Sequence, residues 1–376
     1  MELLRHDEVL HRRLLRPLQL AHGLAALAAV AATAVAPRPA RAVIGGAPDP
    51  GDPAVVALEP AQCTGTLVAP RVVLTAAHCL WGRDPTHLNA FFGADVHGRG
   101  RRIAVIDGRL APGWDPATQE HDLAVVLLAE PASGIAPLPL LRAPIDDRLL
   151  GATLRIVGFG ADRTKQEGTT RLTAYLAATI VDGGGPSATC LGDSGGPALL
   201  SAGGVEYLAA VTSRGDAGCR AFAVRTRVDP YVADFIQPYV DATQPGAART
   251  GDRCAYPAQC ATGLCRPADD DPASRFCSAA CTRDADCPRA MTCLGRRCAY
   301  PPPSPGSLGA PCDRDADCRG WLCAGAAPGG PRRCAVACVP SAPRPCAPGF
   351  ACVPSGRPAA GSVCLPSELA PGRRTT

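Results

Sequence analysis

The distribution of the 20 cysteines restricts the fold of this 376-residue chain more than any other feature. Four cysteines lie before residue 220, and the other sixteen lie after residue 253. An even number of regularly spaced cysteines indicates disulfides and an oxidising compartment. A chain of this length has room for two or more domains. The sequence therefore predicts a cysteine-poor N-terminal part and a C-terminal part that depends on covalent links for its stability.

The sixteen C-terminal cysteines form an internal repeat of two eight-cysteine modules, at residues 251–299 and 310–365. The first module holds Cys254, Cys260, Cys265, Cys277, Cys281, Cys287, Cys293 and Cys298, and the second holds Cys312, Cys318, Cys323, Cys334, Cys338, Cys346, Cys352 and Cys364. Eight cysteines allow many pairings, among which the sequence does not choose. Residues 242–250 form a linker before the first module, and the Pro-rich stretch 300–309 is expected to be a stiff spacer between the two. The spacing weakly resembles that of Dickkopf-type or EGF-like modules, which implies binding of a protein or glycan.

Residues 313–317 have the aspartate spacing that opens an EF-hand loop. However, Ala324 stands where such a loop needs its bidentate glutamate. We therefore interpret the aspartates as a solvated surface and predict no metal site and no cofactor.

Residues 43–241 are a succession of short apolar or β-branched segments separated by Gly/Pro turns. The predicted strands are 64–68, 72–75, 103–106, 123–128, 153–157, 171–178, 207–211 and 222–227. Many short strands at close spacing favour a closed or sandwiched all-β fold. One helix is predicted at residues 229–239, where Val232, Phe235, Ile236 and Tyr239 have helical spacing.

Residues 1–42 are predicted to be a signal peptide, with or without a short pro-segment. An Arg-containing start precedes an apolar run at residues 24–36 that is too short to span a bilayer. Cleavage is expected after Ala42, or alternatively after Ala36. We expect a secreted protein, extracellular or periplasmic, without a membrane span in the mature chain. The near absence of lysine, with Lys165 the only one, suggests a bacterial source.

The formal net charge of +4 is concentrated at the N-terminus, because residues 1–42 hold six arginines against three acidic residues. Removal of that segment leaves a nearly neutral chain. The composition therefore offers no electrostatic basis for binding nucleic acid or an anionic membrane.

Three short motifs carry the chemistry. The stretch 190–197, Cys-Leu-Gly-Asp-Ser-Gly-Gly-Pro, surrounds Ser194 with glycines, and its turn can aim the amides of Gly192 and Ser194 at one point, as an oxyanion hole requires. Upstream lie Thr-Ala-Ala-His-Cys, with His78, and His-Asp-Leu-Ala-Val-Val, with Asp122. A serine hydroxyl needs an adjacent imidazole to take its proton, and a buried carboxylate orients that imidazole. Taken singly, each residue also fits an ordinary core or turn position.

Together these motifs resemble those of the trypsin/chymotrypsin-like serine endopeptidases, in the order His, Asp, Ser. Over residues 43–241, the resemblance implies two six-stranded β-barrels with a C-terminal helix and the site between the barrels. It also implies the disulfides Cys63–Cys79 and Cys190–Cys219, for which free thiols or a metal site are the alternatives. The implied activity is peptide-bond hydrolysis through an acyl-enzyme, with polypeptides as substrates. A non-catalytic binding protein and a protease inhibited by its own tail are the alternative functions.

The resemblance also aligns a substrate pocket. Ala188 lies at its base, and the pocket also includes Thr189, Ser213, Gly215, Ala223 and Arg225. Without a carboxylate at the base, a Lys or Arg side chain before the scissile bond (the P1 position) would bury an unpaired charge, so we predict a small or medium-sized apolar P1 residue. Arg225 with Thr189 would instead favour an acidic P1 residue, unless Asp216 pairs with that arginine. Only 22 positions separate Leu172 from Ser194, which implies that a loop flanking the cleft is missing.

Residues 43–46, Val-Ile-Gly-Gly, resemble the mature N-terminus of the family, whose amino group pairs with the aspartate before the nucleophile. That aspartate is Asp193, and the amine of Val43 is expected to be its partner. A cut after Arg41 would leave one additional residue, which we expect to displace the amine. The sequence therefore predicts that one cut after Ala42 serves both export and activation.

Overall fold

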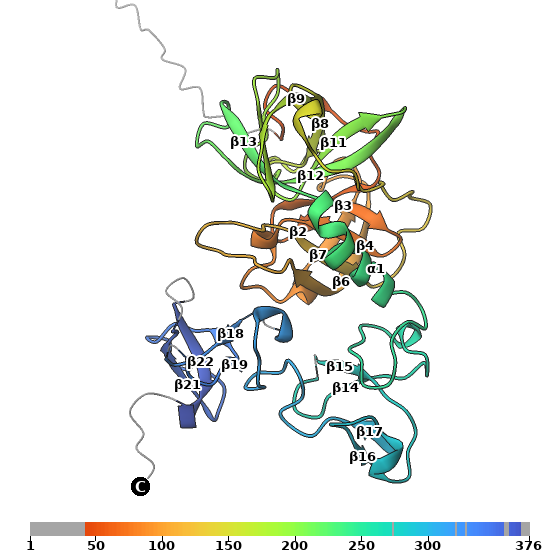
Figure 1. The fold of residues 1–376 in the computed structure, drawn as a ribbon, viewed down its shortest axis with the longest axis vertical. Helices are drawn as coiled ribbons and strands as arrows, with labels where there is room; N and C mark the ends of the chain where they lie inside the picture. Colours follow the sequence, from red (N-terminus) through yellow and green to blue (C-terminus); the bar gives the residue numbers. More distant parts are fainter. Residues whose placement is uncertain (1–41, 273, 320–321, 328, 357–360, 370–376) are drawn as a thin grey trace, which may run out of the picture. The chain divides into compact units, whose positions relative to one another are not determined.

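The computed structural model describes residues 42–369 apart from 273, 320–321, 328 and 357–360. Between residues 42 and 227, the regular secondary structure consists mainly of short antiparallel strands (Figure 1). The predicted signal peptide, apart from its last residue, Ala42, lies outside the described residues. Among the helices of the described part, none is long and apolar enough to cross a membrane.

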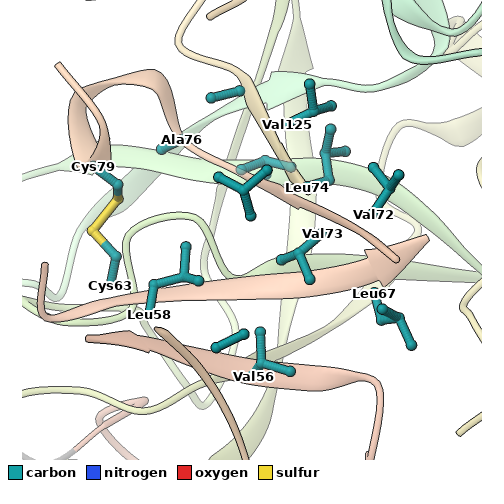
Figure 2. Packing of buried hydrophobic residues seen from close by; sticks show 14 of the residues in the cluster. Val56, Leu58, Cys63, Leu67, Val72, Val73, Leu74, Ala76, Cys79 and Val125 are labelled. Atoms are coloured by element: carbon teal, nitrogen blue, oxygen red, sulfur yellow. A yellow bond between two sulfur atoms is a disulfide. The ribbon is translucent and has the colours of Figure 1, made fainter. Parts of the chain in front are cut away.

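The first barrel is a closed antiparallel ring in the order β2-β3-β4-β7-β6-β5. Its strands are β2 (Val55–Glu59), β3 (Cys63–Ala69), β4 (Val72–Thr75), β5 (Asn89–Phe92), β6 (Arg101–Leu110) and β7 (Ala124–Leu128). Aliphatic side chains from β2, β3 and β4 fill its interior, as Figure 2 shows for Val56, Leu58, Leu67 and Val73. Burial of this apolar surface is the main stabilising contribution to the barrel.

The second barrel is built from β8 to β13, with β1 attached to the edge of β9. Its strands are β1 (Ala47–Pro48), β8 (Thr153–Gly158), β9 (Gln166–Tyr175), β10 (Thr179–Gly183), β11 (Pro197–Ala202), β12 (Val205–Gly215) and β13 (Phe222–Arg227). The pairing of β8 with β9 closes the ring. The predicted fold, two six-stranded β-barrels, is therefore confirmed.

The predicted helix is present but irregular. A 3₁₀ turn at Asp229–Tyr231 leads into a π-helical turn at Val232–Ile236 and then into α1 (Gln237–Ala242). The four apolar side chains singled out by their spacing are all buried. They belong to the apolar cluster of the first barrel, so the helix after the second barrel packs back onto the first.

The strand predictions are correct for β4 and β13, one or two residues short for β3 and β8, and one residue too long for β7. They fall well short of the full lengths of β6 and β12, and β9 begins five residues before the predicted start. Four barrel strands were not predicted: β2, β5, β10 and β11. In three of these strands most residues are buried, so no alternation of polar and apolar residues marks them.

The C-terminal part consists of small hairpins held by disulfides. The strands are β14 (Cys265–Pro267), β15 (Arg275–Cys277), β16 (Thr292–Leu294), β17 (Arg297–Ala299), β18 (Cys323–Ala324), β19 (Arg333–Cys334), β20 (Val336–Ala337), β21 (Phe350–Pro354) and β22 (Ser362–Pro366). The disulfides are Cys254–Cys265, Cys260–Cys277, Cys281–Cys293, Cys287–Cys298, Cys312–Cys323, Cys318–Cys334, Cys338–Cys352 and Cys346–Cys364. Each group of four consecutive cysteines therefore pairs first with third and second with fourth, and each eight-cysteine module is two such units.

The aspartates with EF-hand-like spacing close a turn of the second module. Asp317 Oδ2 accepts hydrogen bonds from the backbone amides of Asp313 and Arg314, at 2.9 and 3.0 Å. Asp286 makes the equivalent bonds to Thr282 and Arg283 in the first module. The repeated aspartates thus satisfy backbone donors of a repeated turn.

Candidate active site

Strand pairing brings His78 and Asp122 together. His78 lies in a 3₁₀ turn that begins two residues after β4, and Asp122 lies two residues before β7. These strands are neighbours, with Thr75 opposite Ala124. The imidazole Nδ1 is 2.7 Å from Asp122 Oδ2, and the backbone amide of His78 donates to Oδ1 at 2.9 Å. The carboxylate therefore holds both the ring and the main chain of the histidine.

The two members of this pair differ in their exposure to solvent. The Asp122 side chain is fully buried, whereas 26% of the His78 side chain is exposed. Ser213 Oγ donates a third hydrogen bond to Asp122 Oδ2, at 2.6 Å. A carboxylate oxygen that accepts from the imidazole favours the tautomer with its proton on Nδ1, which leaves Nε2 free to accept a proton.

The turn that carries Ser194 is packed against the turn that carries His78. The Ser194 carbonyl accepts the amide of Thr64 at 2.8 Å and lies 3.9 Å from the Cys79 sulfur. A Cβ on Gly195 would come within 2.1 Å of Thr75 Oγ1 and 2.2 Å of the Thr64 carbonyl oxygen. The glycine therefore permits a contact of its turn with the start of β3 and the end of β4 that no larger residue allows.

The amides of Gly192 and Ser194 are the predicted donors of an oxyanion hole, and the Gly192 carbonyl belongs to the peptide unit between them. This carbonyl accepts a hydrogen bond from Thr64 Oγ1 at 2.9 Å. Within the described part of the chain, neither the amide of Gly192 nor that of Ser194 donates to a protein acceptor. Two backbone donors of one turn are thus left for a developing negative charge.

Asp193 holds this turn in place through hydrogen bonds to three backbone amides. Its fully buried carboxylate accepts backbone amides from Val43 at 3.0 Å, Cys190 at 2.9 Å and Gly160 at 3.0 Å. Burial raises the pKa of Asp193 to about 6, and the three amide donors act in the opposite direction. In the uncut chain the Val43 nitrogen thus contacts Asp193 as an amide, whereas the pairing of a freed Val43 amine stays a prediction.

Two disulfides brace the site. Cys63–Cys79 ties the start of β3 to the histidine turn, as Figure 2 shows. Cys190–Cys219 ties the nucleophile turn to the segment between β12 and β13. Both cross-links are the ones that the resemblance implies.

The residues aligned with the pocket lie on three neighbouring segments. Ala188 bridges to Ile44, Thr189 is buried beside it, and Gly215 on β12 pairs with Ala223 on β13. Ser213 lies on the same strand as Gly215. Small side chains therefore dominate the positions aligned with the base and walls.

Arg225 was considered as a pocket residue that could pair with Asp216, but its partner is a different aspartate. The guanidinium is fully buried and forms a bidentate pair with Asp182, at 2.5 and 2.9 Å, while Nη2 lies 3.4 Å from Thr189 Oγ1. Asp216, the partner considered from the sequence, instead accepts backbone amides of its own loop, including that of Phe222. The correction follows from strand register, because Asp182 on β10 lies opposite Ala223, two residues before Arg225.

Several residues of the site carry no sequence motif. Thr64 orients the Gly192 carbonyl, Asp182 neutralises Arg225, and Ser213 supports the triad carboxylate in addition to its predicted pocket position. Tyr231 donates to or accepts from His121 Nδ1 at 2.7 Å, beside Asp122. Each of these contacts joins positions far apart in the chain, so spacing does not reveal them.

Sequence comparison identifies known proteins to which this chain is similar. A sequence model of the family described as Trypsin matches residues 43–236. Coagulation factor XII from Sus scrofa is 32% identical over 174 residues, which cover 36% of this chain and 28% of the relative. Trypsin from Saccharopolyspora erythraea is 30% identical over 181 residues, covering 42% of this chain and 76% of the relative. A Crotalus adamanteus protein described as inactive snake venom serine proteinase 13 is 27% identical over 231 residues, or 51% of this chain and 84% of the relative.

The fold and the site thus define a serine protease with two β-barrels. The chain belongs to the trypsin family of serine proteases, because the family model matches more than half of the residues of the chain. The chain covers less than a third of the length of the factor XII relatives. The relatives come from animals and from Saccharopolyspora erythraea, so the bacterial source stays a prediction.

Proposed function

We propose that this protein is a secreted serine endopeptidase in which Ser194 is the nucleophile, His78 the general base and Asp122 the residue that orients the base. The observation that carries this proposal is the bond of 2.7 Å between a buried carboxylate and a partly exposed imidazole, with the serine turn packed against the same histidine turn. Proteolytic activity on polypeptides follows from that arrangement and from the family.

The geometry supports an acyl-enzyme mechanism. His78 Nε2 takes the proton of Ser194 as its oxygen attacks the scissile carbonyl carbon, and Asp122 stabilises the imidazolium. The amides of Gly192 and Ser194 stabilise the oxyanion. The imidazolium then donates its proton to the leaving amine, and water hydrolyses the ester by the same route.

For the P1 residue we propose a small or medium-sized apolar side chain. Ala188 leaves the pocket base without a carboxylate, so a basic side chain would lack a partner. Asp182 already neutralises Arg225, so an acidic side chain would gain little from that arginine. Basic and acidic P1 side chains are therefore both disfavoured.

The P1 proposal is tested by adding a charge at the pocket base. Ala188→Asp should move the dominant P1 residue in a positional-scanning peptide library from apolar to Arg or Lys. The matched control is Ala188→Asn, which has nearly the same volume without the charge and should gain no basic preference. Dominant cleavage after Arg or Lys by the unmodified protein would overturn the proposal.

For the remaining parts we propose an exported protein, with a protease domain at residues 43–241 and two cysteine-rich modules that bind a protein or glycan. The disulfides of both parts support an oxidising compartment. The rival function, a protease-like scaffold without activity, has a precedent in the relative described as inactive. Retention of the bonded His78–Asp122 pair with Ser194 favours the enzyme.

A further inference from the structure

The buried guanidinium of Arg225 contacts residues at both ends of the turn that carries Ser194. Its Nη1 donates to Thr212 Oγ1 at 2.5 Å, and its Nη2 lies 3.4 Å from Thr189 Oγ1. Thr189 directly precedes Cys190, where the turn begins, and Thr212 is bonded to the residues where the turn ends. A single side chain therefore connects the two ends of the nucleophile turn.

Thr212 passes the contact from Arg225 to the end of the turn. Its backbone amide and its hydroxyl both donate to the Gly196 carbonyl, at 2.9 and 3.0 Å, and its own carbonyl accepts the amide of Gly195 at 2.8 Å. A hydroxyl has one proton, so the Thr212 oxygen that donates to Gly196 is left to accept from Arg225. The hydrogen bonds therefore run in one direction, from the guanidinium to the backbone of the turn.

Asp182 holds the guanidinium in the orientation that these contacts require. Its two carboxylate oxygens accept from Arg225 Nε at 2.5 Å and from Nη2 at 2.9 Å. The two residues lie on the neighbouring strands β10 and β13, and their side chains are 2% and 0% exposed. Because a bidentate pair fixes the plane of the guanidinium, Nη1 points at Thr212.

Stability alone does not explain a buried pair at this position. Removing two charges from water costs on the order of several kcal/mol per ion, and apolar residues of similar volume often stabilise a protein equally well. The same strand carries a second buried pair, Arg227 with Asp229, bonded at 3.0 and 2.6 Å. Arg227 also donates to the Leu176 carbonyl, which lies outside the nucleophile turn. The two pairs therefore share their chemistry and differ in what their guanidinium groups hold.

We propose that Arg225 is a positioning residue for the nucleophile turn, with Asp182 as its anchor. The inference rests on the proposed function, because it concerns the turn whose amides stabilise the oxyanion. The guanidinium keeps Thr189 and Thr212 at a fixed separation, and the backbone between them is thereby held in the conformation that aims these amides. Its loss should slow the chemical step more than it weakens substrate binding.

Arg225→Lys tests the proposal, because an ammonium keeps the charge beside Asp182 but lacks the fork that reaches Thr189 and Thr212 together. For a small peptide ester, kcat should fall about tenfold or more, while KM changes less than about threefold. The reaction with a small dialkyl fluorophosphate, which has no P1 side chain, should slow in parallel. This second rate separates an effect on the turn from an effect on the pocket.

The matched control is Arg227→Lys, the same exchange at the second buried pair of the strand. It should leave kcat unchanged, and Tm measured for both variants controls for folding. Unchanged kcat in folded Arg225→Lys, or an equal loss in the two variants, would contradict the positioning role.

Thr212 offers a second test that leaves the ion pair in place. Thr212→Val keeps the shape of the side chain without its hydroxyl, whereas Thr212→Ser keeps the hydroxyl without the methyl group. If Thr212 only fills space, serine should be the more harmful exchange. We expect instead that kcat of the valine variant is at least about fivefold below that of the serine variant. Equal values or the reverse order would overturn the proposal.

The outcomes distinguish this inference from the proposed function. If the unmodified protein hydrolyses peptides and folded Arg225→Lys keeps its kcat within about twofold, the positioning role is wrong and the endopeptidase stands. If the unmodified, folded protein neither hydrolyses peptides nor reacts with the fluorophosphate, the proposed function is wrong, and the inference falls with it. If Arg225→Lys does not fold, the order of the two Thr212 variants gives the decision.

Discussion

At the scale of single residues, the site depends on a few carboxylates with different surroundings. Asp122 is buried among three donors, and Asp193 is buried among three backbone amides. Asp182 is committed to Arg225. Each aspartate therefore has its own set of partners, and Asp122 and Asp193 each lead to a prediction.

Asp122→Asn should lower kcat by on the order of 10⁴-fold, because the amide favours the wrong imidazole tautomer. Tm should change little, since the asparagine has the same shape. The matched control is Asp234→Asn, at an exposed position of the terminal helix, which should leave kcat unchanged. A peptide ester assay measures both, and a loss below about tenfold would show that His78 does not depend on this carboxylate.

The raised pKa of Asp193 predicts that the stability of the uncut chain depends on pH. Its pKa is raised from 3.8 to about 6 by burial, so the folded state favours the protonated carboxyl. The stabilisation is present below about pH 4 and is lost as the pH rises through 6, a change of about 3 kcal/mol at most. Denaturant unfolding of the Ser194→Ala precursor between pH 4 and 7 measures it. The same precursor with Asp193→Asn should show a flatter profile, and identical profiles would refute the assignment.

At the scale of elements, the site is assembled by turns that follow strands. Pairing of β4 with β7 brings His78 to Asp122, and the turn before β11 packs on the turn after β4. The apolar core of the first barrel holds these strands in register (Figure 2). The element-scale prediction concerns the tightest of these contacts.

Gly195→Ala should destabilise the protein by several kcal/mol and abolish the probe reaction, because its Cβ would meet Thr75 and Thr64 at 2.1 and 2.2 Å. Gly134→Ala is the matched control. This exposed glycine has nearly the same φ, 83° against 82°, with no neighbouring atom within 4 Å. It should cost only about 1 kcal/mol. Similar losses of Tm in the two variants would show that strain, not packing between the turns, is decisive.

The sequence predicted the barrels, the helix and the contact of His78 with Asp122 because each has a local signature. Ser194 lies among glycines, and the eight predicted strands have apolar runs between turn residues. The roles of Thr64 and Asp182 were not predictable, since each is defined by a contact with a residue distant in the chain.

At the scale of the whole molecule, a large barrel domain is combined with small modules that have little apolar core. The four-cysteine units share one pairing pattern, and two of them, at residues 281–298 and 312–334, also share an aspartate-closed turn. Cross-links compensate for the small core by restricting the unfolded chain. A binding role for the modules and a catalytic role for the barrels predict that the two are separable.

A chain that ends at residue 245 should hydrolyse small peptide substrates with a kcat/KM within about twofold of that of the full chain. The reason is that every proposed catalytic and pocket residue lies before residue 226. An increase of tenfold or more on truncation would indicate a tail that inhibits the protease. Chromatography and Tm of the shortened chain control for folding.

The most direct test of the central claim is active-site labelling of the secreted protein with a fluorophosphonate, followed by mass mapping of the modified residue. We predict stoichiometric modification of Ser194, parallel loss of peptidase activity, and no labelling of His78→Ala or Ser194→Ala. Peptidase activity that persists after complete labelling, or modification at a residue other than Ser194, would contradict the account.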